Sequence, residues 1–131
     1  EKIADDVYLV STADFMSLYA ANNICRGIRR YALSSTIRLS GIIYNERSSR
    51  NDISIVEKFA GMVGTHVVGN IPMSSYISSA EIERKTAVEK YPDSDIAQHF
   101  VLLAKKMLEN DIACIPEPVT DEEVEDLCRQ M

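Results

Sequence analysis

The sequence predicts an α/β fold in which helices cover both faces of a parallel β-sheet, the three-layer αβα arrangement of a doubly wound sheet. Short apolar, β-branched runs alternate along the chain with segments whose apolar residues recur every three or four positions. This order of strand, helix, strand and helix is typical of parallel sheets. The chain has 131 residues, of which 46% are hydrophobic and 26% charged, so its composition fits one globular domain and excludes a disordered chain.

The elements of the first half follow from the spacing of apolar residues. A strand is expected at 6–10 (DVYLV), where apolar and β-branched residues cluster. A helix is expected over 14–31, because its apolar residues are spaced by three and four. The run 37–44 (IRLSGIIY) predicts a second, buried strand. A second helix is expected over 52–62, with Gly64 after it as a stop signal.

The second half continues the same alternation. A third strand is expected at 65–71 and ends at Pro72. Serines after this proline favour the start of a helix over 76–85. The break at 91–94 (YPDS) precedes a long helix over about 96–107, whose apolar residues are again spaced by four and three.

The acidity of the protein is concentrated at its C-terminal end. The formal net charge is −6, and eight acidic residues but only one basic residue lie in the last 23 positions. We therefore expect a packed domain over 1–115 and an acidic tail over 116–131 that adds little to the core. Thr120 followed by Glu123 fits a capping box, which predicts a short helix over 121–129 in this tail.

The composition excludes several classes of function. Before the tail the chain is close to neutral and has no broad basic surface for nucleic acid, and the cluster Arg26, Arg29 and Arg30 is most simply a solvated helix face. No apolar run approaches the roughly 18 residues that a membrane span needs. The chain begins with Glu1, without a secretory leader, and three strands make a narrow sheet, so we expect it to be a piece of a longer protein.

Metal and disulfide chemistry are not indicated. Cys25, Cys114 and Cys128 are odd in number and widely spaced, and they form no CxxC pair. The two histidines, His66 and His99, lie apart from these cysteines and from each other. We therefore predict no metal ligand and no disulfide framework in this chain, and a location in the reducing cytoplasm.

Candidate ligand-binding residues follow the second and third strands, because parallel sheets bind ligands beyond the carboxyl ends of their strands. The amide of Asn45, in the segment 45–50, can donate and accept at once, as the N6 and N7 edge of adenine requires. Alternatively, Asn45 caps its own loop. Pro72, in the segment 72–75, either ends the strand or holds a rigid loop beside a base.

Catalytic motifs are absent from the sequence. No GxxxxGKS/T phosphate loop occurs, and no serine has a histidine and an acid in a suggestive context. We therefore predict no catalytic residue in this chain.

Three segments resemble the second half of the nitrogenase iron protein family. They are 15–28 (FMSLYAANNICRGI), 38–47 (RLSGIIYNER) and 80–89 (AEIERKTAVE) with 92–94 (PDS), and the similarity extends over almost all of 1–119. The resemblance implies a sheet of the P-loop NTPase type and a homodimer that holds one 4Fe-4S cluster between its subunits. It also implies that MgATP drives electron transfer to a separate nitrogenase or nitrogenase-like catalytic partner.

The resemblance assigns the nucleoside end of the ATP site to this chain. The asparagine that matches Asn45 contacts adenine in the family, and the backbone of a loop lines the base. In this chain that loop consists of Ile71, Pro72, Met73 and Ser74. Here Met73 and Ser74 stand where the family usually has Arg and Asp, and Ser78 replaces a glutamine. These departures weaken side-chain recognition of the nucleoside and favour a nitrogenase-like paralogue.

The family's phosphate loop, cluster cysteines and main docking surface would lie before Glu1, and none of this chain's cysteines matches a cluster ligand. Two interpretations follow. In the first, the chain is the C-terminal part of an ATP-dependent iron–sulfur reductase and is inactive alone. In the second, it is a degenerate nucleotide-binding or interaction module without electron transfer.

Overall fold

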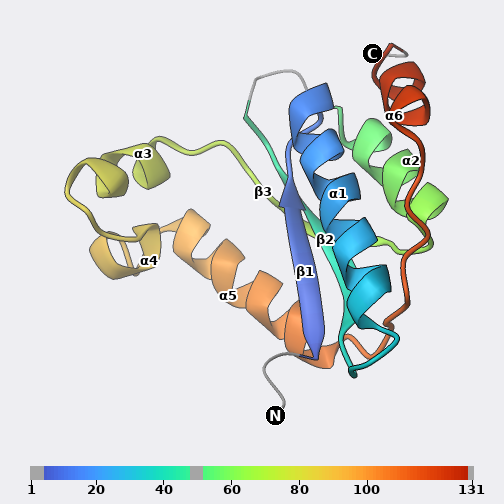
Figure 1. The fold of residues 1–131 in the computed structure, drawn as a ribbon. Helices are drawn as coiled ribbons and strands as arrows, with labels where there is room; N and C mark the ends of the chain where they lie inside the picture. Colours follow the sequence, from blue (N-terminus) through green and yellow to red (C-terminus); the bar gives the residue numbers. More distant parts are fainter. Residues whose placement is uncertain (1–4, 48–51, 130–131) are drawn as a thin grey trace.

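The computed structural model describes residues 5–47 and 52–129, and Figure 1 shows its arrangement. Three parallel strands form one sheet in the order β1-β2-β3. The strands are β1 (Asp6–Ser11), β2 (Arg38–Asn45) and β3 (Val67–Ile71). The predicted alternation of strands and helices is confirmed, and each predicted strand agrees with the observed one to within two residues.

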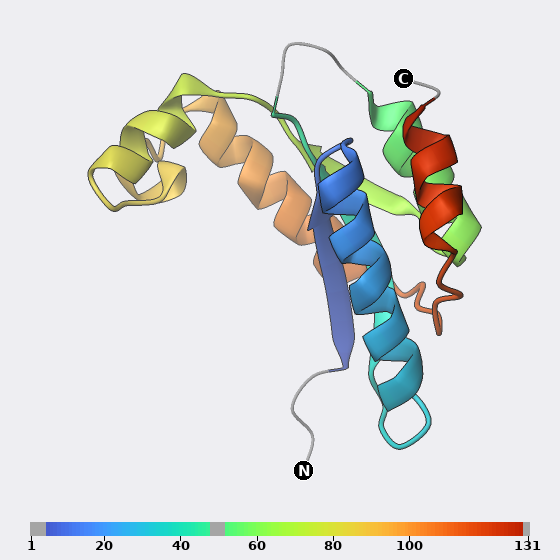
Figure 2. The ribbon, with the colours of Figure 1, turned by 45° about the horizontal axis from the view of Figure 1, so that its top comes forward.

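Helices lie on both faces of the sheet, so the predicted three layers are present (Figures 1 and 2). One face carries α1 (Phe15–Tyr31), α2 (Ile53–Val63) and α6 (Asp121–Cys128). The other face carries α5 (Asp95–Glu109), which packs along β3. Two short helices, α3 (Ser75–Ile82) and α4 (Ala87–Lys90), continue from the N-terminal end of α5 away from the sheet.

The helix ends follow local capping chemistry. Asp14 caps α1, since its side chain accepts a hydrogen bond from the backbone N–H of Ser17 (2.9 Å). The predicted capping box of Thr120 and Glu123 is confirmed at the start of α6. Gly64 ends α2 in the left-handed region (φ 93°), a conformation that glycine adopts without a steric penalty.

The prediction of one helix over 76–85 is wrong at its C-terminal end. The helix ends at Ile82, because Arg84 has left-handed backbone (φ 59°) and the N–H of Lys85 turns back to the carbonyl of Ala80 (2.9 Å). The short helix α4 that follows was not predicted. Thr86 caps it by accepting a hydrogen bond from the backbone N–H of Glu89 (3.1 Å).

The hydrophobic core fills the space between the sheet and the helices α1, α2 and α6. The expectation that the acidic tail adds little to this core is wrong. Val124 and Leu127, on the inner face of α6, belong to the same cluster as Phe59 of α2 and Leu18 of α1. Pro116 is also fully buried. The acidic residues of α6 instead face outward, which is why the composition of the tail concealed its packing.

A buried amide attaches the C-terminal segment to α1. Asn22 has no exposed surface, its Nδ2 donates to the carbonyl of Val119 (2.7 Å), and its Oδ1 accepts from the N–H of Val119 (2.9 Å). The basic cluster contributes too: Arg26 donates to the same carbonyl (3.2 Å), and Arg29 donates to the carbonyl of Pro116 (3.2 Å). Two of these arginines therefore also bind the chain's own C-terminal segment.

Further along this segment, Cys114 forms an antiparallel bridge with Leu39 at the start of β2. Among the described residues no helix is long and apolar enough to cross a membrane.

Candidate functional site

A groove of about 650 Å³ lies where β2 and β3 end and α3 begins. All five residues predicted to bind a nucleoside line it: Asn45, Ile71, Pro72, Met73 and Ser74. The structure therefore brings the two predicted segments together at the carboxyl end of the sheet, the usual position for a ligand in a parallel α/β fold.

Strand register explains why the two segments meet. Asn45 pairs with Ile71 as the last register pair of β2 and β3. The N–H of Glu46 then donates to the carbonyl of Ile71 (2.9 Å), which holds the two strand ends together. Pro72 follows directly, and its lack of an N–H costs nothing because the strand has ended.

The side-chain amide of Asn45 has no hydrogen-bond partner among the residues that the structure describes. Its residue is half-buried at the edge of the groove, so a ligand can reach both its donor and its acceptor. Positions 48–50 of the predicted segment 45–50 lie outside the described residues.

The residues at which the chain departs from the family differ in what they offer a ligand. Ser78, which replaces a glutamine, lines the groove. The hydroxyl of Ser74 accepts a hydrogen bond from the N–H of Tyr76 (3.2 Å), so it serves as the N-cap of α3. Met73 is 56% exposed beside the groove and presents an apolar surface. Neither residue replaces a carboxylate.

The groove has further lining residues to which sequence reasoning assigned no individual role. Glu46, Arg47 and Ser75 lie within the predicted segments 45–50 and 72–75. Ile77, Glu81 and Phe100 lie outside those segments and were missed. Ile77, Glu81 and Phe100 come from α3 and α5, and only the three-dimensional arrangement places them here.

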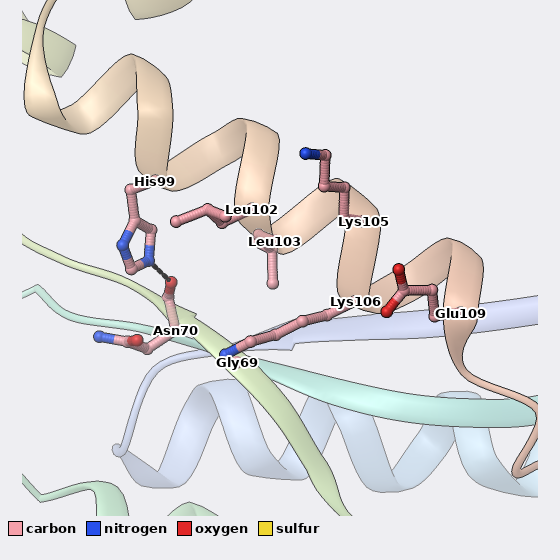
Figure 3. A pocket seen from close by; sticks show the side chains of 8 residues that line it. All are labelled: Gly69, Asn70, His99, Leu102, Leu103, Lys105, Lys106 and Glu109. Carbon is pink, nitrogen blue, oxygen red and sulfur yellow. Dashed lines mark hydrogen bonds between the residues drawn. The ribbon is translucent and has the colours of Figure 1, made fainter.

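A second, smaller cavity of about 290 Å³ lies between β3 and α5 (Figure 3). His99 of α5 points toward β3, where its Nε2 lies 2.5 Å from the carbonyl oxygen of Asn70. The side chain of Asn70 turns to the first groove, and its Nδ2 donates to Oε2 of Glu46 (3.3 Å). Asn70 therefore connects His99 of α5 with Glu46, which lines the groove.

The cysteines do not fit the ligand set of an iron–sulfur cluster. Burial, together with nearby Cys114, raises the pKa of the Cys25 thiol to about 12, which disfavours the thiolate that a cluster needs. Burial also raises the pKa of Cys114 and of Cys128. In the described part of the chain no three histidine, cysteine or acidic side chains gather as a metal site.

The chain was compared with known proteins. The model of the "4Fe-4S iron sulfur cluster binding proteins, NifH/frxC family" matches residues 1–131. A nitrogenase iron protein of Methanococcus voltae is 44% identical over 127 residues, which are 97% of this chain and 46% of the relative. Nitrogenase iron protein 2 of Methanobacterium ivanovii is also 44% identical, over 98% of this chain and 48% of the relative. The chain thus spans about half the length of the curated relatives it matches.

A solved structure shares the fold. The cell division ATPase MinD of Pyrococcus furiosus superimposes with a TM-score of 0.63 over 81% of this chain and 43% of MinD, at 19% identity. This likeness confirms the predicted fold, part of a parallel sheet of the P-loop NTPase type. The family match over residues 1–131 shows that the chain belongs to the NifH/frxC family of 4Fe-4S iron sulfur cluster binding proteins.

Proposed function

We propose that this chain forms the nucleoside-binding part of an ATP-dependent iron–sulfur reductase that passes electrons to a nitrogenase or nitrogenase-like catalytic partner. The observation that carries the proposal is the groove that joins Asn45 with the loop 71–74 at the carboxyl end of the sheet. Family membership gives this groove its interpretation, since the curated relatives are nitrogenase iron proteins.

The residues of the chain have a limited task in this function. Asn45 offers a donor and an acceptor to the adenine edge, and the loop 71–74 offers its backbone beside the base. Hydrolysis of MgATP would drive electron transfer. The sequence has no phosphate loop, so the groups that bind the phosphates would come from another part of the protein. We place the cluster ligands in another part of the protein, because none of this chain's cysteines matches a cluster ligand of the family and burial raises the pKa of all three thiols.

We further propose that the working protein is a cytoplasmic homodimer that meets a separate catalytic component. The support is membership of the family and the nitrogenase iron proteins among the relatives. The final substrate of that component does not follow from this chain.

One observation favours the second interpretation, a nucleotide-binding or interaction module without electron transfer. The hydroxyl oxygen of Ser74 accepts a hydrogen bond at the start of α3, and this side chain does not offer the nucleoside the carboxylate that the resemblance leads us to expect there. Base binding then depends on Asn45 and on backbone groups. Reduction of a catalytic partner by the reconstituted complete protein would contradict this alternative.

The binding role of Asn45 is tested by Asn45→Ala in the complete protein that contains this chain. Loss of paired hydrogen bonds to a desolvated base edge costs about 1–3 kcal/mol. We therefore expect about 5- to 150-fold weaker MgATP binding in calorimetric titration, with reduced preference for ATP over GTP. Asn23→Ala, which changes an exposed asparagine of α1 outside the groove, is the control.

A purely structural role for Asn45 makes a different prediction. If the amide only caps its loop, Asn45→Ala lowers the free energy of unfolding by about 1 kcal/mol and leaves base preference unchanged. A melting curve recorded beside the titration separates the two roles.

A further inference from the structure

We propose that Glu46 reads the exocyclic amino group of the bound purine, and that Asn70 positions its carboxylate for this task. The inference rests on the proposed function, because it concerns the same groove. It adds a specificity-determining residue that the resemblance does not assign and that the order of residues alone does not reveal.

The carboxylate of Glu46 is fixed at the base-binding end of the groove. Its backbone N–H is bound to the carbonyl of Ile71 (2.9 Å), and its Oε2 accepts a hydrogen bond from Nδ2 of Asn70 (3.3 Å). Two separate interactions, one through the backbone and one through the side chain, thus hold the residue. A group held in this way loses less conformational entropy when it binds a ligand.

Asn70 is itself anchored from the opposite side. Its carbonyl oxygen lies 2.5 Å from Nε2 of His99, on α5 (Figure 3). The backbone of this residue is therefore held by a helix on one side, while its side chain holds Glu46 on the other. This arrangement makes Asn70 a positioning residue, whose effect on a ligand passes through Glu46.

The second oxygen of Glu46 is available to a ligand. No described residue donates a hydrogen bond to Oε1, and the residue is half-buried in the lining of the groove. An ionised carboxylate only accepts hydrogen bonds, so it binds a donor and repels phosphate. Asn45, the preceding residue, also lines the groove.

The chemistry of the purines identifies the donor. Adenine carries one exocyclic amine at N6 and guanine carries one at N2, and both are hydrogen-bond donors that a carboxylate accepts. Hydrogen bonds to a charged acceptor are roughly twice as strong as neutral ones. Glu46 therefore gives the groove a means to prefer a base with an amino group over a base without one.

The test compares matched nucleotide pairs in the complete protein that contains this chain. Affinities are measured for ATP against purine riboside triphosphate, which lacks the N6 amine, and for GTP against ITP, which lacks the N2 amine. In the wild type we expect the amine-bearing member of at least one pair to bind about 10-fold more tightly. Glu46→Ala should reduce this difference, with the remainder due to Asn45, and the pair of nucleotides whose affinity ratio changes identifies the amine that Glu46 binds.

Asn70→Ala tests the positioning role, since it removes the donor to Glu46 and keeps the backbone carbonyl that faces His99. We expect this variant to reduce the ratio of affinities within a nucleotide pair, but by less than Glu46→Ala does. Glu57→Ala, which changes an exposed carboxylate of α2, should leave this ratio unchanged. An equal loss of affinity within both pairs in Glu46→Ala would assign Glu46 to the ribose and overturn the inference. Absence of any nucleotide binding by the wild type would instead refute the proposed function itself.

Discussion

The two faces of the sheet are built differently. On the face of α1, α2 and α6, large side chains such as Leu18, Val56 and Phe59 have no exposed surface and form one continuous core. On the face of α5, the buried residues of α3 and α4 are alanines, and every residue of β3 is only half-buried. The first face therefore stabilises the fold, whereas the second leaves room for the groove. Substitutions on the first face should lower the free energy of unfolding, whereas substitutions at the groove should change nucleotide affinity.

Removal of α6 should have the largest effect on stability. A chain that ends after Val119 loses Val124 and Leu127 from the core, and deletion of large buried side chains costs about 2–5 kcal/mol each. We expect the free energy of unfolding to fall by at least about 4 kcal/mol in urea denaturation. Ile82→Ala, which changes an 84% exposed residue on the other face, should cost almost nothing. If truncation lowers the free energy of unfolding by less than about 1 kcal/mol, the two faces do not differ as described.

Asn22→Ala should have the next largest effect. It leaves the N–H of Val119 without the partner that Asn22 provides, while the carbonyl of Val119 keeps the hydrogen bond from Arg26. An unsatisfied polar group in a packed region costs about 1–3 kcal/mol. We expect a loss of about 2 kcal/mol in chemical denaturation. The matched control is Asn23→Ala at the exposed neighbouring position, which should change stability by less than about 0.5 kcal/mol. Equal losses in both variants would contradict a specific role for Asn22.

The thiol of Cys25 should make stability depend on alkaline pH. Burial raises its pKa from 9.0 to about 12 in the folded state, so between these values the folded chain keeps a proton that the unfolded chain releases. Stability is therefore complete below pH 9 and falls above it, with a limiting slope of about 1.4 kcal/mol per pH unit. Denaturation curves between pH 8 and about pH 10.5 should show this slope in the wild type and less of it in Cys25→Ala. The same change at half-buried Cys128 should alter the slope less.

Local chemistry allowed much of the fold to be predicted. The capping box of Thr120 and the stop at Gly64 depend on neighbours within a few residues, and both were predicted correctly. The end of α3 was not, because a left-handed Arg84 has no signature in its residue type. The charges around it are also spaced as on a continuous helix.

Long-range contacts account for what the sequence did not reveal. The acidic composition of the C-terminal segment hid the two apolar residues that α6 buries, and nothing near Asn22 indicates a partner at Val119. In the groove, Asn45 and the loop 71–74 could be proposed because both follow strands. Glu46 lies in the predicted segment 45–50, but its individual role could not be proposed, since that role depends on Asn70 on the neighbouring strand. The binding role of all these residues stays a prediction.

The pairing of Asn22 with Val119 also has a consequence for synthesis of the chain. The two residues are 97 positions apart. At about 5–20 residues per second, a ribosome makes Val119 roughly 5–20 s after Asn22. Helices form within about a microsecond, so nascent α1 exists for seconds without the segment that satisfies its amide and covers its apolar face. During translation the side of α1 that contacts this segment therefore stays uncovered for that time.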